Sequence, residues 1–339
     1  MNRRSFLIQV PAAGLAIGCW SGREHGAVAT PYSEIAVSAP KGTDVPTVLV
    51  FMPKTPQALE VWTGLRDELK RDFKLVAVQV EGRHSVDVFT QAMHRHRASA
   101  IVLMNNPTLA AYRHFQARAD RKRFPPAIVV MTSFLTGRPS TIATTGISYE
   151  VPLITAVTNM RKLMAKPIHR VGIVARSNLR GFVEQQLKIA AREQVVAHFE
   201  QVSARPNAAE IKRALRIVKQ DADAVWVLND DRLLSPRLIA EGWLPGMNER
   251  PWVPTIVGAA SLVAPGTNFG TFAVLPDHTA LGTQTAGMIL DLADNDWTLD
   301  EEMDVQLPLS TIATVDLVQA QERFALRPDA LQRVDRVLR

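Results

Sequence analysis

The chain has 339 residues, of which 47% are hydrophobic and 21% charged; this composition excludes an intrinsically disordered chain and supplies enough apolar residues for two domains. Its 39 Lys and Arg residues exceed its 33 Asp and Glu residues, which gives a net charge of +6, but the basic residues are scattered and no known recognition motif accompanies them. We therefore expect no nucleic-acid partner. The single cysteine excludes an internal disulfide framework and a cysteine-based zinc site.

Residues 1–18 have the layout of an export signal, with a positively charged start and an apolar run too short to span a bilayer as a stable helix. NRRSFL (2–7) resembles the twin-arginine signal. LAIGC, which ends at Cys19, resembles a bacterial lipobox, in which the cysteine is acylated. The alternative is a signal peptide that is cut elsewhere, with Cys19 incidental. Residues 19–46 are rich in Ser, Gly, Ala and Pro and predict a tether, so we expect a periplasmic or otherwise extracytoplasmic protein that contacts the membrane only through a lipid anchor.

From Thr47 onward, short apolar runs rich in β-branched residues alternate with amphipathic stretches about a dozen residues long. This alternation predicts βα units and a parallel sheet. The predicted strands of the first half are 47–52, 74–80, 100–104 and 127–132, and the predicted helices are 56–71, 86–97 and 108–121. Together they form one doubly wound lobe.

A second series of similar number and spacing begins behind an amphipathic stretch at 151–164. Its predicted strands are 170–175, 195–202, 224–228 and 253–258, with helices at 179–193, 208–219 and 235–241. Strands 271–275 and 305–309 and helices 278–292 and 315–326 then fit return crossings between the lobes. The predicted fold class is α/β, with two doubly wound parallel-sheet lobes joined by a multi-crossing hinge: 47–145 plus 275–303 form lobe 1, and 146–274 plus 304–339 form lobe 2.

The sequence contains no motif for a cofactor, a metal or covalent catalysis. The first βα turns, MPKTP (52–56) and RSN (176–178), lack the glycines of a nucleotide fingerprint. His94 and His96 are two residues apart on a predicted helix, so their rings point to different faces. Asp231 follows a predicted strand, but no nucleophile motif accompanies it. We therefore expect neither an enzyme nor a cofactor.

Polar side chains recur where the predicted strands end, in both halves of the chain. In open α/β sheets ligands bind beyond the carboxyl ends of the strands, so these side chains are candidate ligand contacts. They are Lys54, Thr55, Asn105, Asn106, Thr108, Thr132 and Ser133 in the first half, and Ser177, Asn178, Asn229, Asp230, Ser261 and Asp277 in the second. Each alone could instead cap a helix or build a turn. Tyr149, Trp226 and Trp243 could stack on a ligand ring or belong to the core.

Four stretches carry a resemblance to a known family: TTGISYEVPLITAVTNMRKLM (144–164), ADAVWVLNDD (222–231), GTFAVLPDHTALGTQTAGM (270–288) and STIATVDLVQAQERFAL (310–326). They are similar to the bacterial ABC-transporter substrate-binding family with the type I periplasmic binding fold, the group that includes tryptophan and tyrosine uptake lipoproteins. The resemblance runs from about Thr47 to Leu338, and LGTQT (281–285) is its most specific piece.

The resemblance implies a solute-binding protein that closes two lobes on an amino acid or similar polar solute and presents it to the membrane permease of an ABC importer. It places ligand contacts at Asn105 to Thr108, Ser133, Ser177, Asn178, Asn229, Asp230 and Asp277. Ser133-Phe134 replaces the family's Asp-Pro pair and His278 replaces its Tyr, which weighs against an aromatic amino acid. The alternative partner is a membrane sensor that reads lobe closure, and nothing within the chain separates the two.

Overall fold

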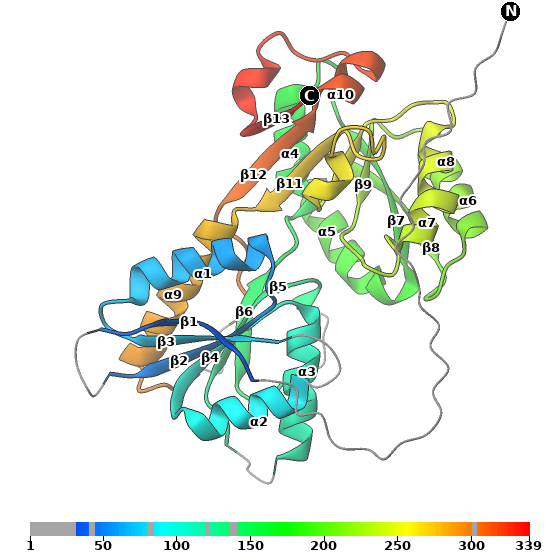
Figure 1. Cartoon of the computed structure of the whole chain (residues 1–339). Coiled ribbons are helices and arrows are strands. Elements are labelled where there is room, and N and C mark those ends of the chain that lie inside the picture. Colours follow the sequence, from blue (N-terminus) through cyan, green and yellow to red (C-terminus); the bar gives the residue numbers. More distant parts are fainter. Residues whose placement is uncertain (1–31, 41–44, 81–84, 120–122, 136–140, 300–303) are drawn as a thin grey trace, which may run out of the picture. The chain divides into compact units, whose positions relative to one another are not determined.

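The computed structural model describes residues 32–40, 45–80, 85–119, 123–135, 141–299 and 304–339 (Figure 1). The predicted export signal and Cys19 lie outside these residues, as does the start of the predicted tether. Two separate sheets with helices on both faces make up the described chain. This arrangement confirms the predicted α/β class with two sheet-centred lobes.

The first sheet has six strands, and every neighbouring pair is parallel except β1 with β3. Its spatial order is β1 (Glu34–Ser38), β3 (Lys74–Gln79), β2 (Thr47–Met52), β4 (Ala98–Met104), β5 (Ala127–Thr132) and β6 (Thr144–Ser148). Alternate residues of its strands face two different helix pairs because side chains alternate along a strand. Val48 and Val50 pack with α1 (Pro56–Leu69) and α9 (His278–Asp294), while Leu49 and Phe51 pack with α2 (Ser85–Arg95) and α3 (Asn106–Arg118).

The second sheet has seven strands and a single antiparallel pair, β11 with β12. Its order is β13 (Arg336–Leu338), β12 (Thr311–Asp316), β11 (Phe272–Pro276), β10 (Thr255–Val257), β9 (Ala224–Val227), β7 (Arg170–Arg176) and β8 (Val196–Val202). The helices α4 (Leu153–Leu163), α5 (Arg180–Arg192) and α10 (Leu317–Arg323) share one core cluster with it. The helices α6 (Ala208–Val218), α7 (Pro236–Leu238) and α8 (Leu244–Asn248), with the π-helical turn Ile239–Trp243, share the other.

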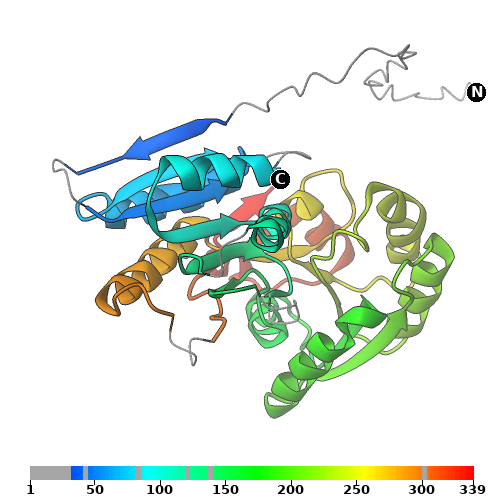
Figure 2. The ribbon, with the colours of Figure 1, turned by 90° about the horizontal axis from the view of Figure 1, so that it is seen from below.

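The chain passes three times between the two sheets, as can be followed in Figures 1 and 2. The first crossing follows β6, the second lies between β11 and α9, and the third precedes β12. The third crossing runs beside the end of β6, from which the first crossing starts, because Ile147 of β6 and Gln306 form a parallel bridge. Helix α9 therefore belongs to the first sheet although its neighbours in sequence, β11 and β12, belong to the second.

The structure departs from the predicted elements at several places. It adds the strands β6 and β13, and it continues the predicted helix at 235–241 through the π-helical turn into α8. Residues 34–38, within the predicted tether, form β1 instead, which pairs with the edge of β3 and is held by hydrogen bonds from His96 to Tyr32 and Glu34. The predicted strand at 305–309 is reduced to the bridge at Gln306, and its apolar Leu309 is 84% exposed. The predicted helix at 315–326 starts later, because Val315 and Asp316 complete β12 and the Asp316 side chain caps α10.

The LGTQT stretch packs α9 against α1 within the first lobe and holds the third crossing against α9. A methyl group on Gly282 would lie 2.1 Å from the carbonyl oxygen of Val61, and one on Gly64 would lie equally close to the carbonyl oxygen of Thr279, so α1 and α9 touch backbone to backbone. The Gln284 side chain donates to the carbonyl of Leu307 and accepts from the amide of Leu309, which fixes the third crossing against α9.

Candidate functional site

Three of the candidate side chains cap helices. Thr55 accepts from the amide of Ala58 at 3.3 Å at the start of α1, and Asn105 accepts from the amide of Thr108 at 3.0 Å at the start of α3. Asp277 accepts from two amides of the first turn of α9, those of Thr279 and Ala280, at 3.0 and 3.3 Å. These contacts are the capping role that the sequence left open, and they fix the first turns of helices that begin at the carboxyl edge of a sheet.

A second group stabilises the end of β5. The Asn106 side chain accepts from the amide of Ser133 at 3.1 Å and so joins the start of α3 to the residue after β5. Thr132 is fully buried, with its hydroxyl 3.4 Å from the carbonyl of Val130. Thr108 is also fully buried, and its hydroxyl has no hydrogen-bond partner among the residues that the structure describes.

Asp230 is committed to an ion pair within the second lobe. Arg176 donates from Nε and Nη2 to its two carboxylate oxygens at 2.6 and 3.0 Å, and the amide of Arg232 donates to Oδ1 at 3.1 Å. The Asp230 side chain is 1% exposed and the Arg176 side chain is 11% exposed. A bidentate pair this deeply buried holds the ends of β7 and β9 in register.

The remaining candidates have side chains without a partner in the described part of the chain: Lys54, Ser177, Asn178, Asn229 and Ser261. Lys54, Asn178 and Ser261 are exposed, and Ser177 and Asn229 are half-buried. Asn229 differs from the others in that it lines a recess. Its amide offers both a donor and an acceptor there.

This recess lies where the first crossing passes the carboxyl ends of β9 and β10. Its wall consists of residues 149–151 from the crossing and of residues 226–229 and 256–258 from the two strand ends. The volume is about 20 Å³, room for one water molecule. Trp226 is 5% exposed and serves as both core and wall, whereas Trp243 is fully buried and donates to the carbonyl of Leu233, so Trp243 belongs to the core.

Glu150 is the residue in this recess that the sequence did not single out. Its Oε1 accepts from the amide of Phe134 at 2.8 Å and its Oε2 from the hydroxyl of Ser148 at 2.7 Å, and the side chain is buried. Burial raises the pKa of this carboxyl, because the charged form is removed from water, although its hydrogen bonds act in the opposite direction. A glutamate directly before the apolar VPLI is the sequence signal that could have identified it.

Glu150 stabilises a strained turn. Met131 and Phe134, at the end of β5, both have a φ of 55°, in the left-handed region that bulky residues rarely adopt. The amide of Phe134 is held by Glu150, and its ring packs edge-on against Phe182 of α5, with ring centres 5.2 Å apart. The ends of β5 and β6 are therefore tied to the core of the second lobe beside the recess.

A chain of three polar side chains connects α1 with the first and second crossings. His278, the first residue of α9, contacts the Tyr149 hydroxyl through Nε2 and the Glu60 carboxylate through Nδ1, each at 2.8 Å. The Tyr149 and His278 rings lie in nearly parallel planes, with 5° between them and their centres 6.0 Å apart. Burial, together with the charges of Glu150 and Glu60, raises the pKa of Tyr149 to about 12, because all three disfavour the phenolate. Tyr149 thus lies in the first crossing, contacts the start of α9 and lines the recess.

The described residues contain no group of three His, Cys, Asp or Glu side chains that could hold a metal ion. In the same residues, no helix has the length and apolar character that a membrane crossing requires.

Comparison with known proteins identifies the fold through structure alone, because neither a family model nor a curated protein sequence matches the chain. The structure is similar to a substrate-binding protein with adhesive properties from Clostridium difficile, in its ligand-free open form, at 13% identity over 87% of this chain and 99% of that one, with a TM-score of 0.61. It is similar to the ABC domain in complex with L-Trp from Streptococcus pneumoniae at 18% identity over 87% and 100% of the chains, with a TM-score of 0.55. A conserved domain protein from Vibrio cholerae matches at 15% identity over 86% and 99%, with a TM-score of 0.54.

These similarities establish the class of fold. The chain has the two-lobe type I periplasmic-binding-protein fold, as the sequence resemblance implies. The recess lies on the carboxyl side of the second sheet, beside the crossings, which is the edge where open α/β sheets bind ligands.

Proposed function

We propose that the protein is an extracytoplasmic solute-binding protein that captures a small polar ligand between its two lobes for delivery to an ABC-type importer. The observation that carries this proposal is the Asn229 side chain, a half-buried amide in the recess beside Glu150 that has no partner among the residues the structure describes. A polar group kept without a partner at such a place is available to a ligand, because burying it unpaired costs free energy.

The recess itself forms the base of the proposed site. A solute lying against it would meet the Asn229 amide, the Trp226 wall and the backbone of the first crossing. Ser177 and Asn178 follow β7 on the same edge of the second sheet, and Lys54 and Ser133 follow β2 and β5 on the first. Closure of the lobes would bring the two sets onto one ligand, so that ligand binding shifts the population from open to closed.

Two of the similar solved structures support a ligand-binding role. One similar protein is an ABC domain in complex with L-Trp, and another is a substrate-binding protein in an open, ligand-free form. The twin-arginine-like start and the lipobox-like LAIGC add export and a lipid anchor at Cys19 to the proposal. The ligand is proposed to leave unchanged, so a long incubation of ligand with purified protein should return it without turnover.

A thermal-shift screen of the exported form against amino acids, small carboxylates, purines and sugars tests the proposal, because a ligand that binds only the folded state raises the melting temperature by mass action. The ligand found should lose most of its shift in Asn229→Ala. Asn159→Ala is the matched control, since Asn159 lies on α4 and its amide donates to the carbonyl of Thr155.

Two outcomes would contradict the assignment. A ligand whose shift survives in Asn229→Ala does not bind at this recess. A loss of unliganded stability in Asn229→Ala as large as the loss of ligand response would make Asn229 a structural residue instead.

A further inference from the structure

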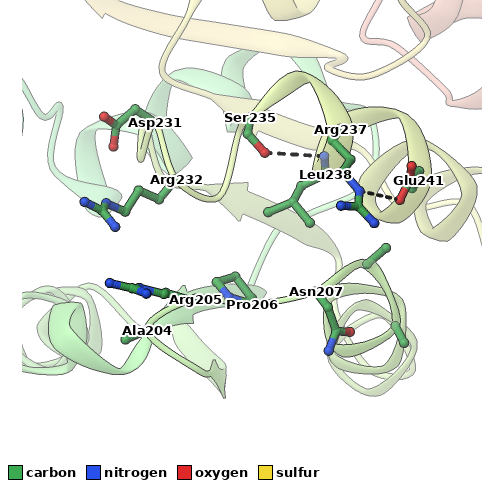
Figure 3. Close-up of a pocket in the computed structure, with 12 residues that line it drawn as sticks. Ala204, Arg205, Pro206, Asn207, Asp231, Arg232, Ser235, Arg237, Leu238 and Glu241 are labelled. Carbon is green, nitrogen blue, oxygen red and sulfur yellow. Dashed lines mark hydrogen bonds and ion pairs between the residues drawn. The ribbon is translucent and has the colours of Figure 1, made fainter.

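The second lobe contains a larger cavity away from the recess. It has a volume of about 660 Å³ and lies between the loop 203–207, which follows β8, and residues 231–241, which follow β9 (Figure 3). All of its lining residues come from this one lobe. Its occupation therefore does not require the lobes to close.

Two guanidinium groups line this cavity without an anionic partner. Arg205 lies on the wall after β8 and Arg232 on the facing wall after β9, as Figure 3 shows. Neither side chain forms an ion pair or hydrogen bond with any other described residue. Two like charges on facing walls of one concavity repel each other unless an anion lies between them.

The neighbouring carboxylates do not neutralise this pair. Glu241 is bound by Arg237, with Nε and Oε2 3.0 Å apart, and Asp230 is bound by Arg176. Asp231 lines the cavity with an exposed carboxylate that pairs with neither arginine. The unpaired charges of the cavity thus sum to positive, and its other walls include the apolar side chains of Pro206 and Leu238.

The two walls are held in place by contacts that leave Arg205 and Arg232 unused. Arg176 bridges them, because it pairs with Asp230 and donates from Nη1 to the carbonyl of Ala204 at 3.3 Å. On the β8 side, the Ser203 amide donates to Glu210 at 3.1 Å, and Asn207 and Glu210 form a capping box. Because the walls are already fixed, the protein loses less conformational entropy when a ligand binds between them.

We propose that this cavity is a second binding site, independent of the solute recess, for a small organic anion. Arg205 and Arg232 would grip a carboxylate or phosphate oxyanion through their planar donor forks, a geometry for which guanidinium is suited. Pro206 and Leu238 would contact an apolar portion of the same molecule. The volume fits a ligand of ordinary metabolite size, since small-molecule sites hold roughly 300–1,000 Å³.

Calorimetric titration of the purified protein at low ionic strength tests this site with three probes: benzoate, succinate and inorganic phosphate. We expect saturable binding of at least one, weakened by added salt. The Arg205→Gln/Arg232→Gln double variant should raise the Kd at least about tenfold, the loss typical of a hydrogen bond to a charged group. Binding of the carboxylates alone would assign the site to carboxylic acids, and binding of phosphate alone to phosphoryl groups.

Three controls test whether any loss of binding comes from Arg205 and Arg232 themselves. Lys188→Gln/Arg192→Gln removes the same charge from exposed positions of α5 and should leave binding unchanged. Asn229→Ala should also leave it unchanged, so failure of the solute recess and failure of this site are distinguishable. Because Arg205 and Arg232 are exposed and unpaired, the unliganded melting temperature should not fall; if it does, the two single variants replace the double variant.

The proposal is overturned if none of the three anions binds saturably. It is equally overturned if uncharged benzamide binds as tightly as benzoate, or if the double variant binds like the unmodified protein.

Discussion

Replacement of Gly282 by alanine should force apart α1 and α9, which touch backbone to backbone in the first lobe. The added Cβ would lie 2.1 Å from the carbonyl oxygen of Val61 and 2.7 Å from the amide nitrogen of Leu65, whereas such contacts essentially never fall below 3.0 Å. The obstructing atoms belong to the backbone of α1, so no side chain can rotate away. The helices must therefore separate, by about 1 Å, which forfeits up to half of the dispersion energy across the contact.

The separation affects one of the two core clusters of the first lobe. Leu65 and Ile289 are fully buried in this cluster, and fully burying such a side chain contributes about 1.5–3 kcal/mol. Overpacking of a tight core typically costs about 1–3 kcal/mol, and alanine returns up to about 1 kcal/mol through its better helix propensity. We expect a net loss of about 2–4 kcal/mol, because a shift of whole helices affects more than one buried side chain.

Gly287→Ala is the matched control, because it is the same substitution on the same helix. A methyl group there would meet nothing within 4 Å, so only the gain in helix propensity remains. Urea unfolding of the wild type and both variants, followed by circular dichroism, should move the midpoint down for Gly282→Ala and slightly up for Gly287→Ala. Equal stability of Gly282→Ala and the wild type would refute the backbone contact between the helices.

Three further predictions concern other parts of the molecule. Glu150→Gln should raise the melting temperature at neutral pH. Because the pKa of the Glu150 carboxyl is raised in the folded state, its contribution to folding stability is fully present below its unfolded pKa and is lost as pH rises through its folded pKa. The difference from wild type should shrink as pH falls toward about 4, near the ordinary pKa of glutamate, and a difference independent of pH would contradict this origin. Asp230→Ala leaves Arg176 buried without its partner and should cost about 3–5 kcal/mol in urea unfolding, whereas Arg237→Ala, at the exposed pair with Glu241, should change little; similar losses in both would count against a buried pair. Cys19→Ser should abolish incorporation of a labelled fatty acid and release the protein from the membrane fraction, and continued labelling would exclude Cys19 as the anchor.

The hydrophobic periodicity of the sequence predicted most of the helices and strands. Most residues of β2, β3, β4 and β5 are buried, so the apolar character of these runs was strong and their predicted bounds agree with the structure within two residues. The elements that were missed depend on long-range pairing. Strand β1 is half exposed and exists through β3 and through His96, which lies more than sixty residues away, so its own composition resembles a tether.

The sequence predicted the candidate site less completely than it predicted the fold. Position at a strand end singled out both Asn229 and the residues that cap helices, because the same residue types serve both roles. Only the structure shows that Thr55 and Asp277 accept from amides of their own helices, while the Asn229 side chain has no partner among the described residues. Position at a strand end did not identify Glu150, because it follows β6, a strand that the sequence analysis did not predict; the apolar VPLI after it was the remaining signal of its burial.

The position of Glu150 also connects the site to the hinge. Its neighbour Tyr149 is bound to His278 at the second crossing, and Glu150 itself holds the turn at Phe134, which packs on the second lobe. Adjacent residues of the first crossing thus contact a second crossing and the end of a strand in the first sheet, while lining the recess. A ligand pressing on this segment would alter contacts on both lobes at once, since packed cores pass small shifts on rather than absorbing them. In the proposed function, the first crossing is therefore the element through which occupation of the recess would bias the lobes toward closure.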